Sequence, residues 1–150
     1  MVKADILKEF APTIRFENGA SVTLDGIQRL FVDYAKKMGI PARFSRDEVV
    51  SGSLLNKTKE ACVVISHPKH ETDYLRFYVR VKRQGQMAFV YISSGGKSAQ
   101  MAKAAKADAQ RKAGKICGAA ITSLGHNRAK YEEEQIYYEC IRRMCSCLAA

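Results

Sequence analysis

Two stretches of alternating side chains constrain the fold of this chain more than any other feature of its sequence. They span residues 74–82 and 87–92, and in both of them apolar residues recur at every second position. Successive side chains of a β-strand point to opposite faces, so this period is typical of half-buried strands. Gln84 and Gly85 lie between the two stretches and form the predicted turn. The pattern therefore predicts a β-hairpin.

The two faces of this predicted hairpin differ in chemical character. One is a core face made of Leu75, Phe77, Val79, Val81, Ala88, Val90 and Ile92. The other interleaves aromatic rings with cations and carries Tyr74, Arg76, Tyr78, Arg80, Lys82, Met87, Phe89 and Tyr91. Exposed rings of this kind can stack on bases while neighbouring cations contact phosphates. The alternative is that a helix covers this face, because sheets of such domains need a helix on at least one side.

Length and charge narrow the class of protein. The chain has 150 residues, of which 47% are hydrophobic and 27% charged, which is typical of one folded domain over residues 1–150. Its formal net charge is +10. This balance favours a polyanionic partner, such as RNA or DNA, or an anionic membrane surface.

The remaining elements before and within the sheet are predicted from periodicity and from turn residues. A short amphipathic stretch containing Ile6, Leu7 and Phe10 is expected to stop at Pro12. A helix is predicted from Leu24 to Met38, with Thr23 as its N-cap and Gly39 as its stop. Strands are predicted at Thr13–Glu17, Glu48–Leu54 and Ala61–Ser66, in addition to the hairpin.

The C-terminal third of the chain has a helical period. An alanine-rich segment places Met101, Ala105, Ala109, Ala113, Ile116, Ala120 and Leu124 on one arc and Lys103, Lys106, Arg111 and Lys115 on the other, with Gly125 as a stop. A last helix over residues 128–147 places Ile136, Tyr137, Cys140, Ile141, Met144 and Leu148 on one face. The sequence thus predicts an α+β fold: a mainly antiparallel sheet of about four strands, one early helix and two or more C-terminal helices.

No set of residues in the sequence has the spacing of a catalytic site, and the chain is interpreted as a non-enzyme. The turn Gly95-Gly96-Lys97-Ser98 matches the end of a P-loop, but the first glycine of that motif would fall at Tyr91. A plain glycine turn that lets the chain leave the sheet explains it better.

The segment Ser98-Ala99-Gln100-Met101-Ala102-Lys103 resembles the start of the second helix of double-stranded-RNA-binding domains. The segment Tyr34-Ala35-Lys36-Lys37-Met38-Gly39-Ile40-Pro41 is similar to the end of the first helix of that family. The resemblance spans about residues 24–113. It implies an order of helix, strands and helix, and binding of duplex RNA by shape.

The five cysteines, the histidines and the chain termini complete the sequence evidence. The cysteines lack the spacing of a disulfide framework or of a zinc site, and small buried hydrophobes explain them better than ligands for a metal. No cofactor is predicted.

Residues 147–150 match a prenylation signal, but the match is only four residues long and chance explains it better than a lipid anchor at Cys147. No signal peptide or transmembrane segment is predicted, and we expect a cytoplasmic protein.

The favoured hypothesis is nucleic-acid binding, of RNA above all, without catalysis. The predicted contact residues are Tyr74, Arg76, Tyr78, Arg80, Lys82, Phe89 and Tyr91 on the hairpin, and Lys97, Lys103, Lys106 and Arg111 on or before the basic helix. The alternative is a protein-interaction or homo-oligomeric assembly module, in which the aromatic face forms a subunit interface and the lysines only solvate the surface.

Overall fold

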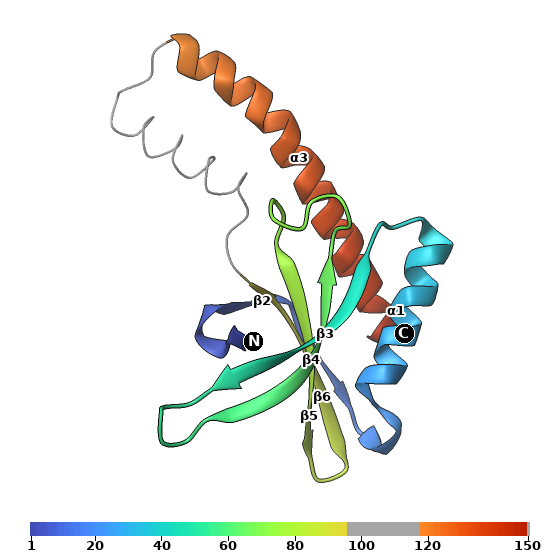
Figure 1. Cartoon of the computed structure of the whole chain (residues 1–150). Helices are drawn as coiled ribbons and strands as arrows, with labels where there is room; N and C mark the ends of the chain where they lie inside the picture. Colours follow the sequence, from blue (N-terminus) through green and yellow to red (C-terminus); the bar gives the residue numbers. More distant parts are fainter. Residues whose placement is uncertain (96–117, 150) are drawn as a thin grey trace.

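The computed structural model is an α+β fold in which two helices pack on one face of a strongly twisted six-stranded sheet (Figure 1). It describes residues 1–95 and 118–149, with side chains described for residues 1–95 and 128–149. The strands are β1 (Val2–Lys3), β2 (Leu7–Phe16), β3 (Arg43–Ser51), β4 (Thr58–Ser66), β5 (Arg76–Gln84) and β6 (Met87–Gly95). The helices are α1 (Leu24–Met38) and α3 (Gly118–Ser146), and three short 3₁₀ turns are η1 (Ala4–Ile6), η2 (Gly19–Ser21) and η3 (Cys147–Ala149).

The strands are arranged in the order β1-β3-β4-β5-β6-β2, and β1 runs parallel to β3 whereas every other neighbouring pair is antiparallel. The α+β class is confirmed, but the predicted number of about four strands is too small. The stretch around Ile6, Leu7 and Phe10 does not stop at Pro12, because β2 continues through that proline to Phe16. Since β2 is an edge strand, a proline that cannot donate a ladder hydrogen bond is tolerated there.

Helix α1 has the bounds that the sequence predicts. The Thr23 side chain accepts a hydrogen bond from the backbone N–H of Gly26 at 3.0 Å, as an N-cap does. Gly39 ends the helix in the left-handed conformation, with φ of +68°. The buried face of α1 consists of Ile27, Phe31 and Ala35, which pack on the sheet.

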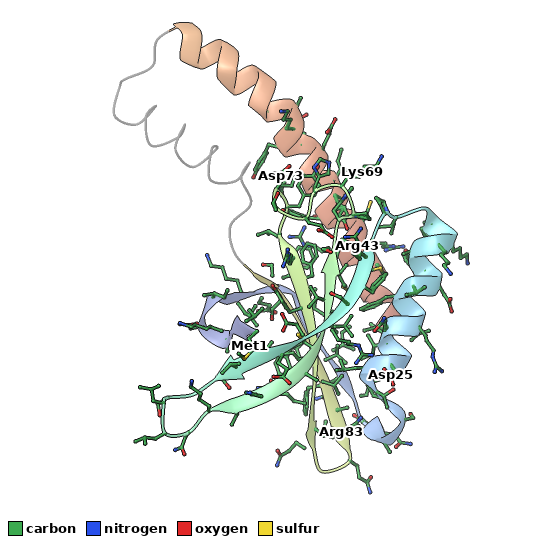
Figure 2. All side chains as sticks on the ribbon, viewed as in Figure 1. Met1, Asp25, Arg43, Lys69, Asp73 and Arg83 are labelled. Atoms are coloured by element: carbon green, nitrogen blue, oxygen red, sulfur yellow. The ribbon has the colours of Figure 1, made fainter. Side chains whose placement is uncertain are left out.

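The hairpin of β5 and β6 is present as predicted, but its turn lies one residue later than Gln84-Gly85, because Gln84 pairs with Met87. The observed two-residue turn is Gly85-Gln86, with φ of +60° at Gly85, and it places Arg80 opposite Tyr91. The predicted core face does lie against the helices, where Phe77, Val79, Val90 and Ile92 join the main core. At the hairpin end, the guanidinium of Arg83 donates hydrogen bonds to the carbonyl oxygens of Gly19 and Val22, which ties η2 to the hairpin (Figure 2).

Helix α3 is longer than the predicted last helix, and its buried face is rotated. It passes through Gly125, so the predicted stop there is wrong; one interior glycine costs only about 1 kcal/mol against alanine. Ile136, expected on the apolar face, is 64% exposed. Its neighbours Tyr137 and Tyr138 are buried, and Glu134 takes a buried position that apolar periodicity could not assign. The buried face consists of Glu134, Tyr137, Tyr138, Ile141, Met144 and Cys145, followed by Leu148 of η3.

The opposite face of the sheet is crossed by the N-terminal segment, residues 2–7, which we call the crossing segment. Its β1 part pairs with β3 at one edge, and β2 begins at the other edge beside β6. Five strand intervals of about 4.8 Å would separate these edges by about 24 Å in a flat sheet, whereas the four residues from Lys3 to Leu7 reach at most about 14 Å. The sheet is therefore curved around the crossing segment. Val2, Ala4 and Leu7 pack there against a second core of Val49, Cys62, Val64 and Tyr78.

The predicted alanine-rich helix falls mostly on residues 96–117, outside the described part of the chain. Among the described residues, no helix is long and apolar enough to cross a membrane.

Candidate nucleic-acid interface

The structure brings five of the predicted contact residues together on the face of β5 and β6 that points away from the helices. Arg80 lies directly opposite Tyr91, and Lys82 lies directly opposite Phe89. Arg76 is on the same face at the start of β5, two strand periods from Arg80. We call these residues, Arg76, Arg80, Lys82, Phe89 and Tyr91, the hairpin face.

Tyr78 has the predicted orientation but is covered. It is only 6% exposed, because the crossing segment packs over it through Leu7 and its neighbours. Its ring occupies the space above Gly95, where an added Cβ would lie 2.6 Å from the ring atom Cε2. Burial is the main cause that raises the pKa of Tyr78. Tyr78 therefore packs in the second core, under the crossing segment, and its ring is not available to stack on a base.

Tyr74 does not lie on the hairpin face. Strand β5 begins only at Arg76, and the backbone N–H of Tyr74 closes a turn to the carbonyl oxygen of His70 at 3.1 Å. The alternation of the sequence therefore cannot be extended back to this residue. Its ring stacks on His70 at 4.3 Å and lies 5.7 Å from the ring of Tyr137 on α3. Figure 2 shows this loop, marked by Lys69 and Asp73, beside α3 on the helix side of the molecule.

Both cations beside Tyr91 lie over its ring. The guanidinium carbon of Arg80 is 5.6 Å from the ring centroid and the ammonium nitrogen of Lys82 is 5.5 Å from it. Such contacts stabilise by about 0.5–1 kcal/mol each at an exposed site. Lys82 is exposed, whereas the side chain of Arg80 is only 14% exposed and pairs with Glu60 at 3.4 Å. Tyr91 thus lies beside Arg80, which is paired with Glu60, and beside Lys82, which is exposed.

The Nε of Arg80 is buried and has no hydrogen-bond acceptor among the described residues. A buried N–H without a partner costs about 1–3 kcal/mol, and more when the group is charged.

A hollow of about 270 Å³ lies next to Tyr91 on the side of β2. Its polar lining consists of Arg80, Tyr91, Ser93, Glu9 and Thr13. The hollow lies where the ladder between β2 and β6 is irregular. Ala11 pairs with Ile92 and Ile14 pairs with Val90, so Pro12 and Thr13 both oppose Tyr91 as a β-bulge does.

Sequence reasoning missed the β2 side of this site. Glu9 and Thr13 lie far from the hairpin in sequence, and only the pairing of β2 with β6 brings them beside Tyr91. The one local signal is Pro12, which in a strand marks an edge or a bulge. The predicted contact residues Lys97, Lys103, Lys106 and Arg111 lie outside the described part of the chain.

The cysteines and histidines offer no competing site in the part of the chain that the structure describes. No group of three or more His, Cys, Asp or Glu side chains there could hold a metal ion. Burial raises the pKa of the Cys62 thiol, and it raises the pKa of Cys145 to about 12, so both are neutral thiols at pH 7. Comparison of the chain with protein-family models, with curated proteins and with solved structures found no match.

Proposed function

We propose that this protein binds single-stranded nucleic acid, without catalysis, on the hairpin face. The observation that carries the proposal is the ring of Tyr91 with two cations over it, next to a hollow. Unstacked bases bind to aromatic rings, and each base stacked on a ring contributes about 1–3 kcal/mol, whereas cations at the same spacing contact the backbone. The helices pack on the other face of the sheet, and among the described residues the crossing segment covers the part of this face that contains Tyr78.

The exposed cations of this face, Arg76 and Lys82, set the expected salt dependence. If Arg76 and Lys82 each neutralise one phosphate, the slope of log K against log salt is about −1.4 for a single strand. Binding would then weaken about sevenfold between 50 and 200 mM salt through these two contacts. Arg80 contributes less to this slope, because Glu60 already compensates part of its charge.

The test is fluorescence anisotropy with labelled 12-nucleotide RNA and DNA, single-stranded and duplex, titrated into nuclease-treated protein at several salt concentrations. Lys82→Glu should weaken binding of single strands and flatten its salt dependence. Lys37→Glu is the matched control, because Lys37 is also an exposed lysine and lies on α1, on the other side of the sheet. Absence of binding at 50 mM salt, or equal effects of the two variants, would overturn the proposal. A preference for duplex RNA would instead favour the mode implied by the resemblance to double-stranded-RNA-binding domains.

One observation favours the alternative of an assembly module. Leu54 and Leu55, in the turn between β3 and β4, are 90% and 94% exposed, and apolar side chains so exposed are typical of contact sites. Sedimentation at varied protein concentration separates the two functions. A stable dimer whose formation protects Phe89 and Tyr91 would favour assembly, and a monomer that binds RNA would exclude it.

A further inference from the structure

The hollow beside Tyr91 has the size and lining of a site for one flat, polar ring. Its volume of about 270 Å³ lies just below the range of about 300–1,000 Å³ that holds drug-sized ligands, so it has room for a single base. Arg80 of β5 and Tyr91 of β6 line the hollow on one side, and Glu9 and Thr13 of β2 line it on the other. A base entering the hollow would therefore lie beside the ring of Tyr91 and the guanidinium of Arg80.

The polar groups that line the hollow include both hydrogen-bond donors and hydrogen-bond acceptors. The guanidinium of Arg80, which lines the hollow and pairs with Glu60 through one nitrogen, carries only hydrogen-bond donors. The carboxylate of Glu9 is exposed, accepts hydrogen bonds only, and has no ion pair among the described side chains. Thr13 and Ser93 add hydroxyl groups that can donate or accept. A purely anionic ligand would be repelled by Glu9, so the lining does not suit a bare phosphate.

We infer that this hollow is a nucleobase pocket that selects bases with an exocyclic amino group. The inference rests on the proposed function and specifies its ligand. Glu9 accepts a hydrogen bond from the amino group, while Arg80 donates to a ring nitrogen or carbonyl oxygen of the same base. Uracil has no amino group and presents carbonyl oxygens on both sides of its one N–H, so a carboxylate beside it meets a repulsive partner. Cytosine and uracil have nearly the same shape and differ mainly at the amino group. A comparison of the two therefore measures the contribution of that group to binding.

The experiment compares labelled rC12 with rU12 in anisotropy titrations of the whole chain at pH 7.5 and 50 mM salt. We expect the unmodified protein to bind rC12 at least about fivefold more tightly than rU12, which is the lower end of discrimination by one base contact. Glu9→Gln should remove this preference, because an amide can both donate and accept. Glu17→Gln is the matched control: it removes the same charge from an exposed residue that follows the far end of β2, and it should leave the preference intact.

The outcomes separate the pocket from the proposed function. A preference for rC12 that is lost in Glu9→Gln and kept in Glu17→Gln supports the pocket. Equal binding of both strands, a preference for rU12, or a preference for rC12 that persists in Glu9→Gln overturns the pocket and leaves nucleic-acid binding in place. Absence of binding to either strand overturns both.

Discussion

Two adjacent tyrosines on α3 provide a direct test of how the helix is held on the sheet. The hydroxyl of Tyr138 accepts a hydrogen bond from the backbone N–H of Leu75 at 2.9 Å and donates one to the carboxylate of Glu134, which is fully buried. The other oxygen of that carboxylate, Oε2, has no partner among the described residues. Tyr138→Phe removes the hydroxyl from both groups at once, so a buried N–H and a buried carboxylate lose their shared partner.

We expect Tyr138→Phe to lower the free energy of unfolding by about 3 kcal/mol, since each buried polar group left unpaired costs about 1–3 kcal/mol. Tyr137→Phe is the control, because the Tyr137 hydroxyl donates only to the carbonyl oxygen of Pro41, an exposed residue, at 2.9 Å. Water can replace that hydrogen bond, so the loss should be about 1 kcal/mol or less.

The assay is urea denaturation followed by circular dichroism. With a slope of about 2 kcal/mol/M, a loss of 3 kcal/mol moves the midpoint by about 1.5 M, and a loss of 1 kcal/mol moves it by about 0.5 M. The slope itself should stay constant in both variants. If Tyr137→Phe destabilises as much as Tyr138→Phe, the buried network around Glu134 does not stabilise the position of α3 and the reasoning is wrong.

Three further predictions concern close packing and titration. Gly19→Ala places a Cβ 2.4 Å from the Cβ of Ala88, so the variant should lose about 2 kcal/mol in the same assay, and Ala88→Gly in the same chain should restore part of it; full stability of Gly19→Ala alone would contradict this. Burial raises the pKa of Cys145 to about 12 from 9.0, so the folded state keeps its proton while the unfolded state releases it. Stability should therefore fall above pH 9 by up to about 1.4 kcal/mol per pH unit, and Cys145→Ala should have a shallower decline. Burial also lowers the pKa of His67, whose Nδ1 accepts a hydrogen bond from the N–H of Lys69 at 3.0 Å, so protonation favours the unfolded state and stability should fall as the pH drops below 6.5; an NMR titration that places the His67 midpoint above 6.5 would refute this.

The elements that could be predicted from the sequence are those whose signals are local. Helix α1 has its cap at Thr23 and its stop at Gly39, and both act on backbone within one turn. Alternation on two strands joined by a short turn predicts the hairpin and the face on which each residue lies, and Arg80 and Tyr91 do lie on one face. It does not fix the register, which is why the turn lies one residue later than predicted.

What could not be predicted depends on contacts between distant parts of the chain. Alternation places Tyr78 on the same face as Arg80, but only the crossing segment determines that one is covered and the other reaches the surface. The length of β2 depends on its pairing with β6, which overrides the signal of Pro12. Glu134 is polar and buried, so a search for apolar periodicity rotated the predicted face of α3 away from the observed one. The hollow beside Tyr91 lies at the β-bulge between β2 and β6. It could not be predicted, because these two strands are far apart in the sequence.

The crossing segment also determines the order in which this sheet can be completed. Val2 pairs with Val49 and Leu7 pairs with Gly95, so the residues at the start of the chain pair with strands that lie far along the sequence. Pairing over such separations has a large loop-closure cost and is slow compared with the formation of α1 or the hairpin. Until that step, β3 and β6 present unpaired N–H and C=O groups on both sides of the sheet. Completion of the sheet therefore replaces the long edges of β3 and β6 by β1, which is only two residues long, and by β2, whose proline cannot donate to a further strand.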